Sequence, residues 1–228
     1  MREPHDDRNT TWTYARPLVT GVFHTMFRMR FVDIENVPLT GPAVISPNHI
    51  SPLDPLIVGV GTAKHCSRMI RFLSGTEFFA QPWVGKGLRA LDQIPLRRGE
   101  NDLEALGNAI DAAKEGSLVG LFPEGKINNG PDLLRGRRGA ARIAVASGAP
   151  LLPVGIWGTQ VRFPGGGWKM RRPIHPTVVV VYGEPIPVDQ DATSAREILH
   201  ITDDLMSELA KLRDRAKELA GRKGYAWD

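Results

Sequence analysis

The sequence predicts a single α/β domain in which a mixed, mostly parallel twisted sheet is flanked by helices, with an amphipathic helix at its N-terminus. Two observations support this fold class. Short apolar runs that suit buried strands alternate along the chain with segments of helical periodicity, which is the order expected of a largely parallel sheet. The chain has 228 residues, of which 42% are apolar and 24% are charged, a composition typical of one soluble globular domain. No internal repeat or linker divides it.

The N-terminal region divides into a polar start and an amphipathic helix. Residues 1–11 are polar, and we expect them to fray. Between residues 12 and 31, apolar side chains recur at helical spacing: Leu18, Val19, Val22, Phe23, Met26 and Phe27. Such a helix either docks onto the protein's own core or lies on a membrane surface, where a basic face beside an apolar one is favourable. We expect residues 1–30 to form a tail and this helix, and residues 31–228 to form the main domain.

The expected strands are short and apolar. They cover residues 31–37, 42–46, 68–73, 117–122, 151–157 and 177–183, and a further short one precedes the arginine pair at 97–98. The expected helices lie at 51–60, 77–91, 101–116, 139–147 and 194–220. Capping signals set several limits: Asn101 with Glu104 makes a capping-box pattern, and Gly116 and Gly148 stop two of the helices.

The composition limits the partners and the compartment. A net charge of +4 favours anionic partners, such as phosphorylated substrates or acidic lipid surfaces. The basic residues do not alternate with aromatic ones in any single stripe, so nucleic acid is not an expected partner. No stretch approaches the roughly 18 apolar residues that span a bilayer, and no secretory signal is visible. The single cysteine, Cys66, fits a reducing compartment, so we expect a cytoplasmic protein. With the amphipathic helix, we expect it to be peripheral on the inner face of the cell membrane.

Three turns that leave expected strands have unusual polar content. They are SPNHISPLD at residues 46–54, QIPLRRGE at 93–100 and LFPEGKINNG at 121–130. In open α/β sheets, functional groups gather on the loops that leave the carboxyl ends of strands. We therefore expect the three turns to meet at one edge of the sheet.

His49 and Asp54 are candidates for a catalytic dyad. If a helix starts near Ser51, Asp54 falls in its first turn and its carboxylate folds back toward the ring of His49. A carboxylate on one ring nitrogen fixes the tautomer and stabilises the imidazolium that forms when the other nitrogen accepts a proton. Because no G-x-S-x-G elbow supplies a nucleophile, such a dyad activates a hydroxyl of the substrate. The alternative is that Asp54 caps a helix and His49 fills a turn.

Basic residues near these turns are candidates for an anion site. Arg97 and Arg98 follow a short strand, and their guanidinium groups suit a phosphate monoester. Lys126 lies on the third turn, and RGRRG at 135–139 precedes a helix N-terminus, where it forms either a phosphate site or a solvated basic face. Glu124 suits a polyol hydroxyl or an ion pair with a nearby arginine. No histidine has a convincing ligand spacing, so no metal is expected.

Four segments resemble, in order, the motif blocks of the glycerolipid acyltransferases, the 1-acyl-glycerol-3-phosphate acyltransferase family. NHISPLD is similar to their N-H-x4-D block, and QIPLRR to a second block that ends in an arginine at the place of Arg98. LFPEG is similar to the third block, and APLLPVGI, centred on Pro153, to the fourth. RGRRGAARIAVASG is similar to the segment that joins the last two. Together the blocks cover roughly residues 31–160, and four blocks in order are far more specific than one.

The resemblance implies an acyltransferase domain at residues 31–228 that moves a fatty acyl group from acyl-CoA, or from acyl carrier protein, to a lysophospholipid hydroxyl. The acceptor that the resemblance implies most directly is 1-acyl-glycerol-3-phosphate, and its acylation gives phosphatidate. Acyl-CoA is a co-substrate, and the resemblance implies no cofactor. His49 would be the base, Asp54 would orient it, and Pro153 would lie on the acyl-donor side. The implied acceptor site is made of Arg97, Arg98, Glu124, Gly125 and Lys126.

Two departures from the family pattern leave the acceptor open. Lys126 and Ile127 stand where the third block usually has a hydroxyl residue and an arginine, and Asp92 stands where a glycine is frequent. Another lysophospholipid or a glycolipid is therefore an alternative acceptor. Two rival functions also stand: a thioesterase, in which water is the acceptor, and a non-catalytic lipid-binding module at the membrane surface.

Overall fold

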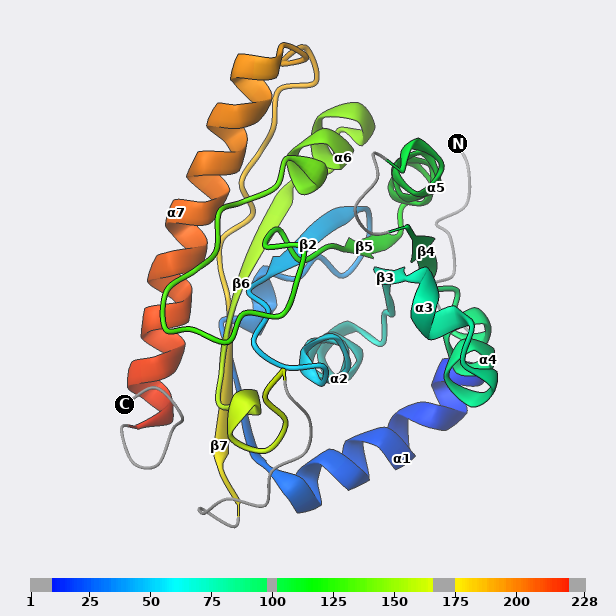
Figure 1. Cartoon of the computed structure of the whole chain (residues 1–228), viewed down its shortest axis with the longest axis vertical. Coiled ribbons are helices and arrows are strands. Elements are labelled where there is room, and N and C mark those ends of the chain that lie inside the picture. The colour runs from blue at the N-terminus through cyan, green and yellow to red at the C-terminus, as the bar shows by residue number, and fades with distance from the viewer. Residues whose placement is uncertain (1–9, 98–101, 166–174, 222–228) are drawn as a thin grey trace.

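A seven-stranded mixed sheet forms the centre of the protein (Figure 1). The computed structural model describes residues 10–97, 102–165 and 175–221. The strand order is β1-β7-β6-β2-β5-β3-β4, and every neighbouring pair is parallel except β6 with β7. The strands are β1 (Arg28–Val32), β2 (Ala43–Pro47), β3 (Ile70–Gly75), β4 (Ile94–Leu96), β5 (Leu118–Gly120), β6 (Leu151–Trp157) and β7 (Thr177–Tyr182). The expected mixed, mostly parallel sheet is confirmed.

Helices cover both faces of this sheet. They are α1 (Thr10–Met26), α2 (Asp54–Cys66), α3 (Thr76–Phe79), α4 (Pro82–Ala90), α5 (Leu103–Lys114), α6 (Gly139–Ser147) and α7 (Ala195–Ala220), with 3-10 turns η1 (Ile34–Asn36) and η2 (Thr159–Val161). Helices α5, α6 and α7 pack side by side on one face, and α1 with α2 lies on the other (Figure 1). Strand residues alternate between the two cores: Val44 faces α5 and α6, whereas Ile45 faces α1 and α2.

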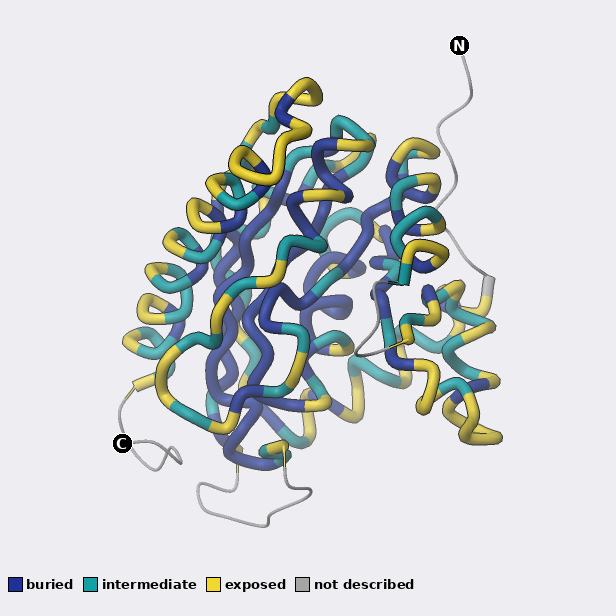
Figure 2. Tube along the Cα trace, turned by 45° about the horizontal axis from the view of Figure 1, so that its top comes forward, coloured by how far each residue is buried: buried dark blue, intermediate teal, exposed yellow. Residues whose placement is uncertain are grey.

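Burial follows these layers. The inner strands of the sheet are mostly buried, the edge strands β1 and β4 are more exposed, and the helices expose their outer sides (Figure 2). β6 is buried at every position, and β7 is buried at all but its first. Strands covered on both faces read as continuous apolar runs, which explains why VVVV in β7 and LLPVGIW in β6 were recognisable from the sequence.

Several boundaries differ from the expectation for local reasons. β1 begins at Arg28 rather than residue 31, because it pairs with β7 from that position. The single helix expected over 77–91 is two helices, α3 and α4, since Pro82 cannot continue a helix and instead occupies the first turn of the second. Helix α5 is capped by Asp102, whose carboxylate accepts the N–H of Ala105. The expected cap, Asn101, lies outside the described residues.

Helix α1 shows features of both expected roles. Trp12, Phe23 and Phe27 are buried in the protein's own cores, so the helix docks onto the domain. On its outer side, Tyr14 and Leu18 are 78% and 72% exposed. None of the helices within the described ranges is both long enough and apolar enough to cross a bilayer.

Candidate active site

Four loops meet at the carboxyl edge of the sheet. The loop after β2 carries His49, the loop after β5 carries Glu124, the loop after β4 carries Arg97, and η2 after β6 carries Thr159. These strands are parallel to one another through β2–β5, β5–β3, β3–β4 and β2–β6, so their carboxyl ends lie at the same edge. The sheet topology therefore brings together the three turns that the sequence singled out.

The His49 and Asp54 side chains form a buried hydrogen-bonded pair. Asp54 is the first residue of α2 and is fully buried, and its Oδ2 lies 3.0 Å from Nδ1 of His49. The same oxygen accepts the N–H groups of Ile50 and Ser51, at 2.7 and 2.8 Å. The carboxylate therefore folds back onto the loop as expected. It does not cap α2, which has no side-chain cap.

The other oxygen of Asp54 accepts a hydrogen bond that the sequence did not reveal. Oγ1 of Thr159 donates to Oδ1 of Asp54 at 2.7 Å, across 105 positions of the chain. An ionised carboxylate is an acceptor only, and four donors around Asp54 match that capacity when the proton of His49 sits on Nδ1. This network leaves Nε2 as the unprotonated nitrogen. Within the described ranges Nε2 has no hydrogen-bond partner, so it is available to a substrate.

Aromatic stacking fixes the plane of the His49 ring. It stacks on Phe122, with ring centroids 3.9 Å apart and an interplanar angle of 22°. Phe122 in turn stacks on Phe72 of β3, at 5.4 Å. A ring held by a carboxylate at one edge and by an aromatic face has little freedom to rotate, which is the preorganisation that a catalytic base requires.

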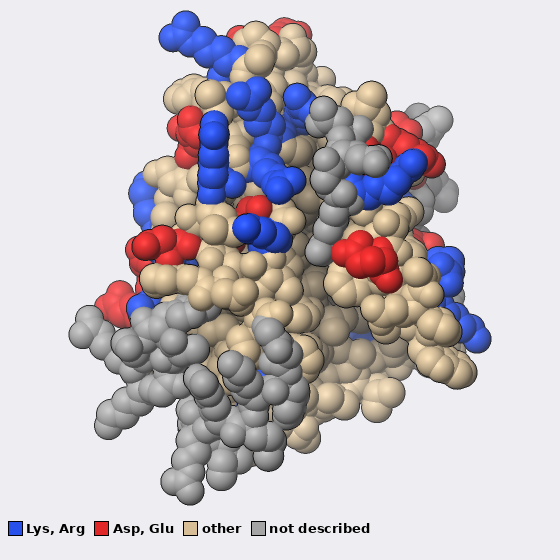
Figure 3. Space-filling model, in the orientation of Figure 1, with Lys and Arg blue, Asp and Glu red and all other residues tan. Residues whose placement is uncertain are grey.

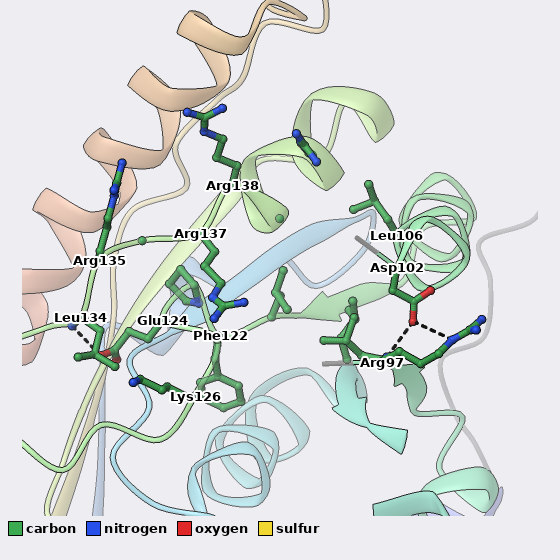
Figure 4. Close-up of a pocket in the computed structure, with 18 of the residues that line it drawn as sticks. Arg97, Asp102, Leu106, Phe122, Glu124, Lys126, Leu134, Arg135, Arg137 and Arg138 are labelled. Atoms are coloured by element: carbon green, nitrogen blue, oxygen red, sulfur yellow. Dashed lines mark hydrogen bonds and ion pairs between the residues drawn. The ribbon is translucent and has the colours of Figure 1, made fainter. Parts of the chain in front are cut away.

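Glu124 links the loops around His49. Its Oε1 accepts the backbone N–H of His49 at 2.8 Å, and its Oε2 accepts the N–H of Leu134 at 2.9 Å and Nδ2 of Asn128 at 3.0 Å. The side chain is buried, and burial raises the pKa of this carboxyl, against the opposing effect of its hydrogen bonds. The three donors are two backbone N–H groups and the side-chain amide of Asn128, and no arginine is among them. Figure 4 shows the carboxylate directed at Leu134.

A cavity of about 770 Å³ adjoins the dyad, since Phe122, the ring that stacks on His49, lies in its lining. One wall is apolar and includes Leu73, Leu96, Leu103 and Leu106. The opposite wall is basic and is formed by Lys126, Arg135, Arg137, Arg138 and Arg142. Lys and Arg side chains accordingly gather over α6 and the loop before it (Figure 3). Glu124 and Gly125 also line this cavity.

Arg97 lies across the cavity from this basic wall (Figure 4). Its guanidinium pairs with Glu104 at 2.7 Å and approaches Asp102 at 3.6 Å. The backbone N–H of Arg97 also donates to Asp102, which is the main reason that the pKa of Asp102 lies below its usual value. Arg97 is thus already neutralised by carboxylates, whereas Arg98, the arginine expected to hold the phosphate, lies outside the described residues.

Gly125 and Pro153 have mainly structural surroundings. Gly125 has a φ of +71°, and a Cβ built there would lie 2.5 Å from Nε of Arg137, so the glycine lets that guanidinium lie over the turn. Pro153 is buried within β6, opposite Ser46, and its carbonyl accepts the N–H of Gly183. It does not line the cavity described above.

Sequence reasoning missed three residues that build the site. Asn48 joins β2 to β6 by exchanging two hydrogen bonds with the backbone of Ile156, at 2.7 and 3.1 Å. Asn128 and Thr159 hold the two carboxylates in place. Their places in the sequence could have indicated two of them. Asn48 directly precedes His49, and Thr159 follows Gly158 at the end of an expected strand.

Comparisons with known proteins match this architecture. The family described as Acyltransferase matches residues 28–157. A 1-acyl-sn-glycerol-3-phosphate acyltransferase of Bacillus subtilis (strain 168) is 26% identical over 187 residues, which cover 81% of this chain and 88% of that protein. The protein of that name in Borreliella burgdorferi is 31% identical over 128 residues, covering 55% of this chain and 50% of that protein.

Two further matches concern a plant protein and a solved structure. The chloroplastic 1-acyl-sn-glycerol-3-phosphate acyltransferase LPAT1 of Arabidopsis thaliana is 26% identical over 166 residues, so that the chain spans 45% of its length. The crystal structure of the 1-acyl-sn-glycerophosphate (LPA) acyltransferase PlsC from Thermotoga maritima has a similar fold, with a TM-score of 0.70 and 23% identity. That match covers 99% of this chain and 86% of the other, and it confirms the expected fold.

Proposed function

The chain belongs to the acyltransferase family, and on that premise we propose that it transfers a fatty acyl group from acyl-CoA to the free hydroxyl of 1-acyl-glycerol-3-phosphate, which yields phosphatidate. The names of the relatives in Bacillus subtilis, Borreliella burgdorferi and Arabidopsis thaliana support this choice of acceptor. The observation that carries the proposal is the buried His49–Asp54 pair at the edge of a basic cavity, with Nε2 of His49 unpartnered in the described part of the chain.

The proposed reaction needs no protein nucleophile. Nε2 of His49 takes the proton of the acceptor hydroxyl while its oxygen attacks the thioester carbonyl of the donor. The tetrahedral intermediate then expels the CoA thiolate, which recovers the proton from the imidazolium. Asp54 stabilises that imidazolium through its 3.0 Å hydrogen bond to Nδ1. General base catalysis of this kind contributes roughly 10²–10⁴-fold to the rate.

Lys126 and Arg137 are the cations proposed to hold the acceptor phosphate. Lys126 lies two residues beyond Glu124 on the loop that is bonded to His49, and Arg137 lies over Gly125 of the same turn. Ile127 is apolar where the family's third block usually carries an arginine. Arg137 supplies a guanidinium from another loop beside that block, so the departure in sequence does not remove positive charge from this side of the cavity.

A membrane surface is the proposed source of the acceptor, reached from the cytoplasmic side. Tyr14 and Leu18 on α1 and Trp83 on α4 are large apolar side chains that are 78%, 72% and 84% exposed. The two helices are neighbours, because Leu91 at the end of α4 packs against the buried cluster that contains Trp12 of α1. Exposed aromatic and aliphatic side chains on adjacent helices are typical of interfacial attachment.

The test is acceptor-dependent release of CoA. Purified protein is incubated with long-chain acyl-CoA, CoA is measured with a thiol reagent, and products from a panel of lysophospholipids and glycolipids are identified by mass spectrometry. We expect release only with a lyso acceptor, highest with 1-acyl-glycerol-3-phosphate, and a loss of at least roughly 100-fold in His49→Ala. His200→Ala, at an exposed histidine on α7, is the matched control.

The alternatives give different results in the same assay. Release of CoA without an acceptor identifies a thioesterase. Binding to vesicles with no turnover on any acceptor identifies a lipid-binding module, and preference for another lysophospholipid or a glycolipid changes the acceptor. If His49→Ala retains the wild-type rate, the mechanism is wrong.

A further inference from the structure

The basic wall of the cavity carries more positive charge than one phosphate monoester requires. Six cationic side chains line the cavity, against the two carboxylates of Asp102 and Glu124. Asp102 is occupied by Arg97, and Glu124 by three N–H donors. A phosphate monoester carries about −1.5 to −2 charges at pH 7, which Lys126 and Arg137 balance. Three arginines remain: Arg135, Arg138 and Arg142, hereafter the outer arginines.

The outer arginines have no carboxylate partner among the residues that the structure describes. This distinguishes them from Arg97 and Arg215, which pair with Asp and Glu side chains. They also point differently from Arg137. Figure 4 shows Arg137 directed toward Phe122, whereas Arg135 and Arg138 extend away from it, so the basic wall has an inner and an outer part.

The loop before α6, which carries Arg135 and Arg138, is held in place by contacts of its backbone with neighbouring segments. The N–H of Arg137 donates to the carbonyl of Pro123 at 2.8 Å. Gly136 lies against α7 so closely that a Cβ built there would meet Met206 at 2.5 Å. These contacts anchor the backbone that presents Arg135 and Arg138, which favours a built anion site over a freely moving basic surface.

The first turn of α6 adds to the same site. α6 begins at Gly139, directly after Arg138, has no side-chain cap and has no acidic residue in its first turn. Its first amides and its dipole therefore favour an anion at the place where Arg138 and Arg142 lie one turn apart. Across the cavity, Leu96, Leu103 and Leu106 offer an apolar surface on which a flat base can pack.

We infer that the outer arginines and the N-terminus of α6 bind the 3′-phosphate and diphosphate of the CoA part of the acyl donor, an inference that rests on the proposed function. CoA carries several phosphate charges on one nucleotide, and its long pantetheine arm separates them from the thioester. One molecule therefore places phosphates at Arg138 and Arg142 and its thioester near His49. Because these cations line a cavity rather than a flat surface, the geometry fits a nucleotide better than the acidic surface of acyl carrier protein.

The decisive experiment measures binding without turnover. Isothermal titration calorimetry of free CoA and of dephospho-CoA is carried out on the wild type, Arg138→Ala, Arg142→Ala and Arg196→Ala. Arg196 is an exposed arginine on α7 outside the cavity, so its variant has the same change in net charge. We expect CoA to bind roughly tenfold more tightly than dephospho-CoA, and each cavity variant to lose about tenfold in CoA affinity. Arg196→Ala should bind as the wild type does.

Kinetics then separate donor from acceptor. The KM for acyl-CoA should rise about tenfold in Arg138→Ala and Arg142→Ala, with the KM for the lyso acceptor and kcat unchanged. A rise in the acceptor KM alone would assign the outer arginines to the acceptor headgroup and overturn the inference. Loss of activity with acyl carrier protein as donor, but not with acyl-CoA, would assign them to that protein. Equal binding of CoA and dephospho-CoA would also overturn it.

Failure of the proposed function gives a different pattern. Suppose that the wild type and His49→Ala both bind CoA, that this binding depends on Arg138 and Arg142 as described above, and that no acyl group reaches any acceptor. The CoA site is then supported and the proposed transfer reaction is wrong. If acyl transfer occurs but the affinity for CoA does not change in Arg138→Ala and Arg142→Ala, the proposed function is supported and the proposed CoA site is wrong.

Discussion

Replacing Glu124 with glutamine tests whether this carboxylate supports His49 or contacts the acceptor. The amide can still present its oxygen to Leu134 and Asn128, but its NH2 group then faces the backbone N–H of His49, which loses its 2.8 Å acceptor. A buried donor left unpaired costs about 1–3 kcal/mol. For a chain of this size that lowers the Tm by roughly 2–12 °C. Because the orphaned N–H belongs to His49, the proposed catalytic base, kcat should fall as well, with little change in the acceptor KM.

The assay is thermal unfolding beside steady-state kinetics. The matched control is Glu104→Gln, because Glu104 is an exposed carboxylate that pairs with Arg97 near the same cavity. Such a surface pair contributes at most about 1 kcal/mol. If Glu124→Gln leaves the Tm and kcat unchanged and raises only the acceptor KM, the carboxylate contacts the acceptor and does not support His49.

The difference in stability between the wild type and Glu124→Gln should depend on pH, and the raised pKa of Glu124 fixes the direction of that dependence. Burial raises the pKa of Glu124 above 4.5, so the folded state retains this proton more readily than the unfolded state. The stability contributed by the protonated carboxyl is complete below pH 4.5 and is lost as the pH rises through the raised value. Glutamine does not titrate. The difference between the unfolding free energies of the wild type and Glu124→Gln should therefore be larger at pH 4 than at pH 7, as measured by urea titration.

Three further predictions follow from single contacts. Thr159→Val removes the hydroxyl that donates to Asp54, so kcat should fall roughly tenfold with both KM values unchanged. Thr159→Ser keeps a hydroxyl and should restore kcat. A change in KM alone would contradict a positioning role. Gly125→Ala places a side chain at a φ of +71° and against Arg137, so we expect a loss of about 1–2 kcal/mol and a higher acceptor KM. Gly107→Ala, in an open position of α5, should not destabilise the protein, and unfolding curves compare the two. Leu18→Ser should weaken binding to anionic vesicles roughly tenfold without lowering the Tm, as seen by sedimentation; unchanged binding would exclude this side of α1 from the interface.

Elements whose signals are local could be predicted from the sequence to the residue. α6 ends at Ser147, where Gly148 stops it as expected, and β6 has its expected limits. α7 starts within one residue of its expected position, where Ser194 and Glu197 form a capping box. In each case the feature that sets the limit is local to the element. It is a glycine stop for α6, a continuous apolar run for β6 and a cap for α7. The start of β1 was misplaced because Arg28 and Arg30 are exposed there and pairing with β7, rather than an apolar pattern, determines the strand.

The same distinction applies to the candidate site. The pairing of His49 with Asp54 follows from a five-residue spacing and was predicted. The donation from Thr159 to Asp54 spans 105 positions, and the bond between His49 and Glu124 spans 75. Which side chains meet across such distances depends on the packing of the whole sheet. No local pattern encodes it.

The pairing of β1 with β7 has a consequence for the order in which the chain folds. Arg28 lies opposite Thr177, so the first strand has no partner until almost 150 further residues have been synthesised. At about 5–20 residues per second this interval lasts roughly 7–30 s. During that time α1 has been synthesised, while the β7 residues that complete its core, Val178 to Val181, have not. Trp12 of α1 can already pack with Ala63 near the end of α2, but Phe23 and Phe27 still lack the β7 part of their core. If α1 attaches to a membrane as proposed, its exposed residues Tyr14 and Leu18 are available for that contact before the sheet is complete.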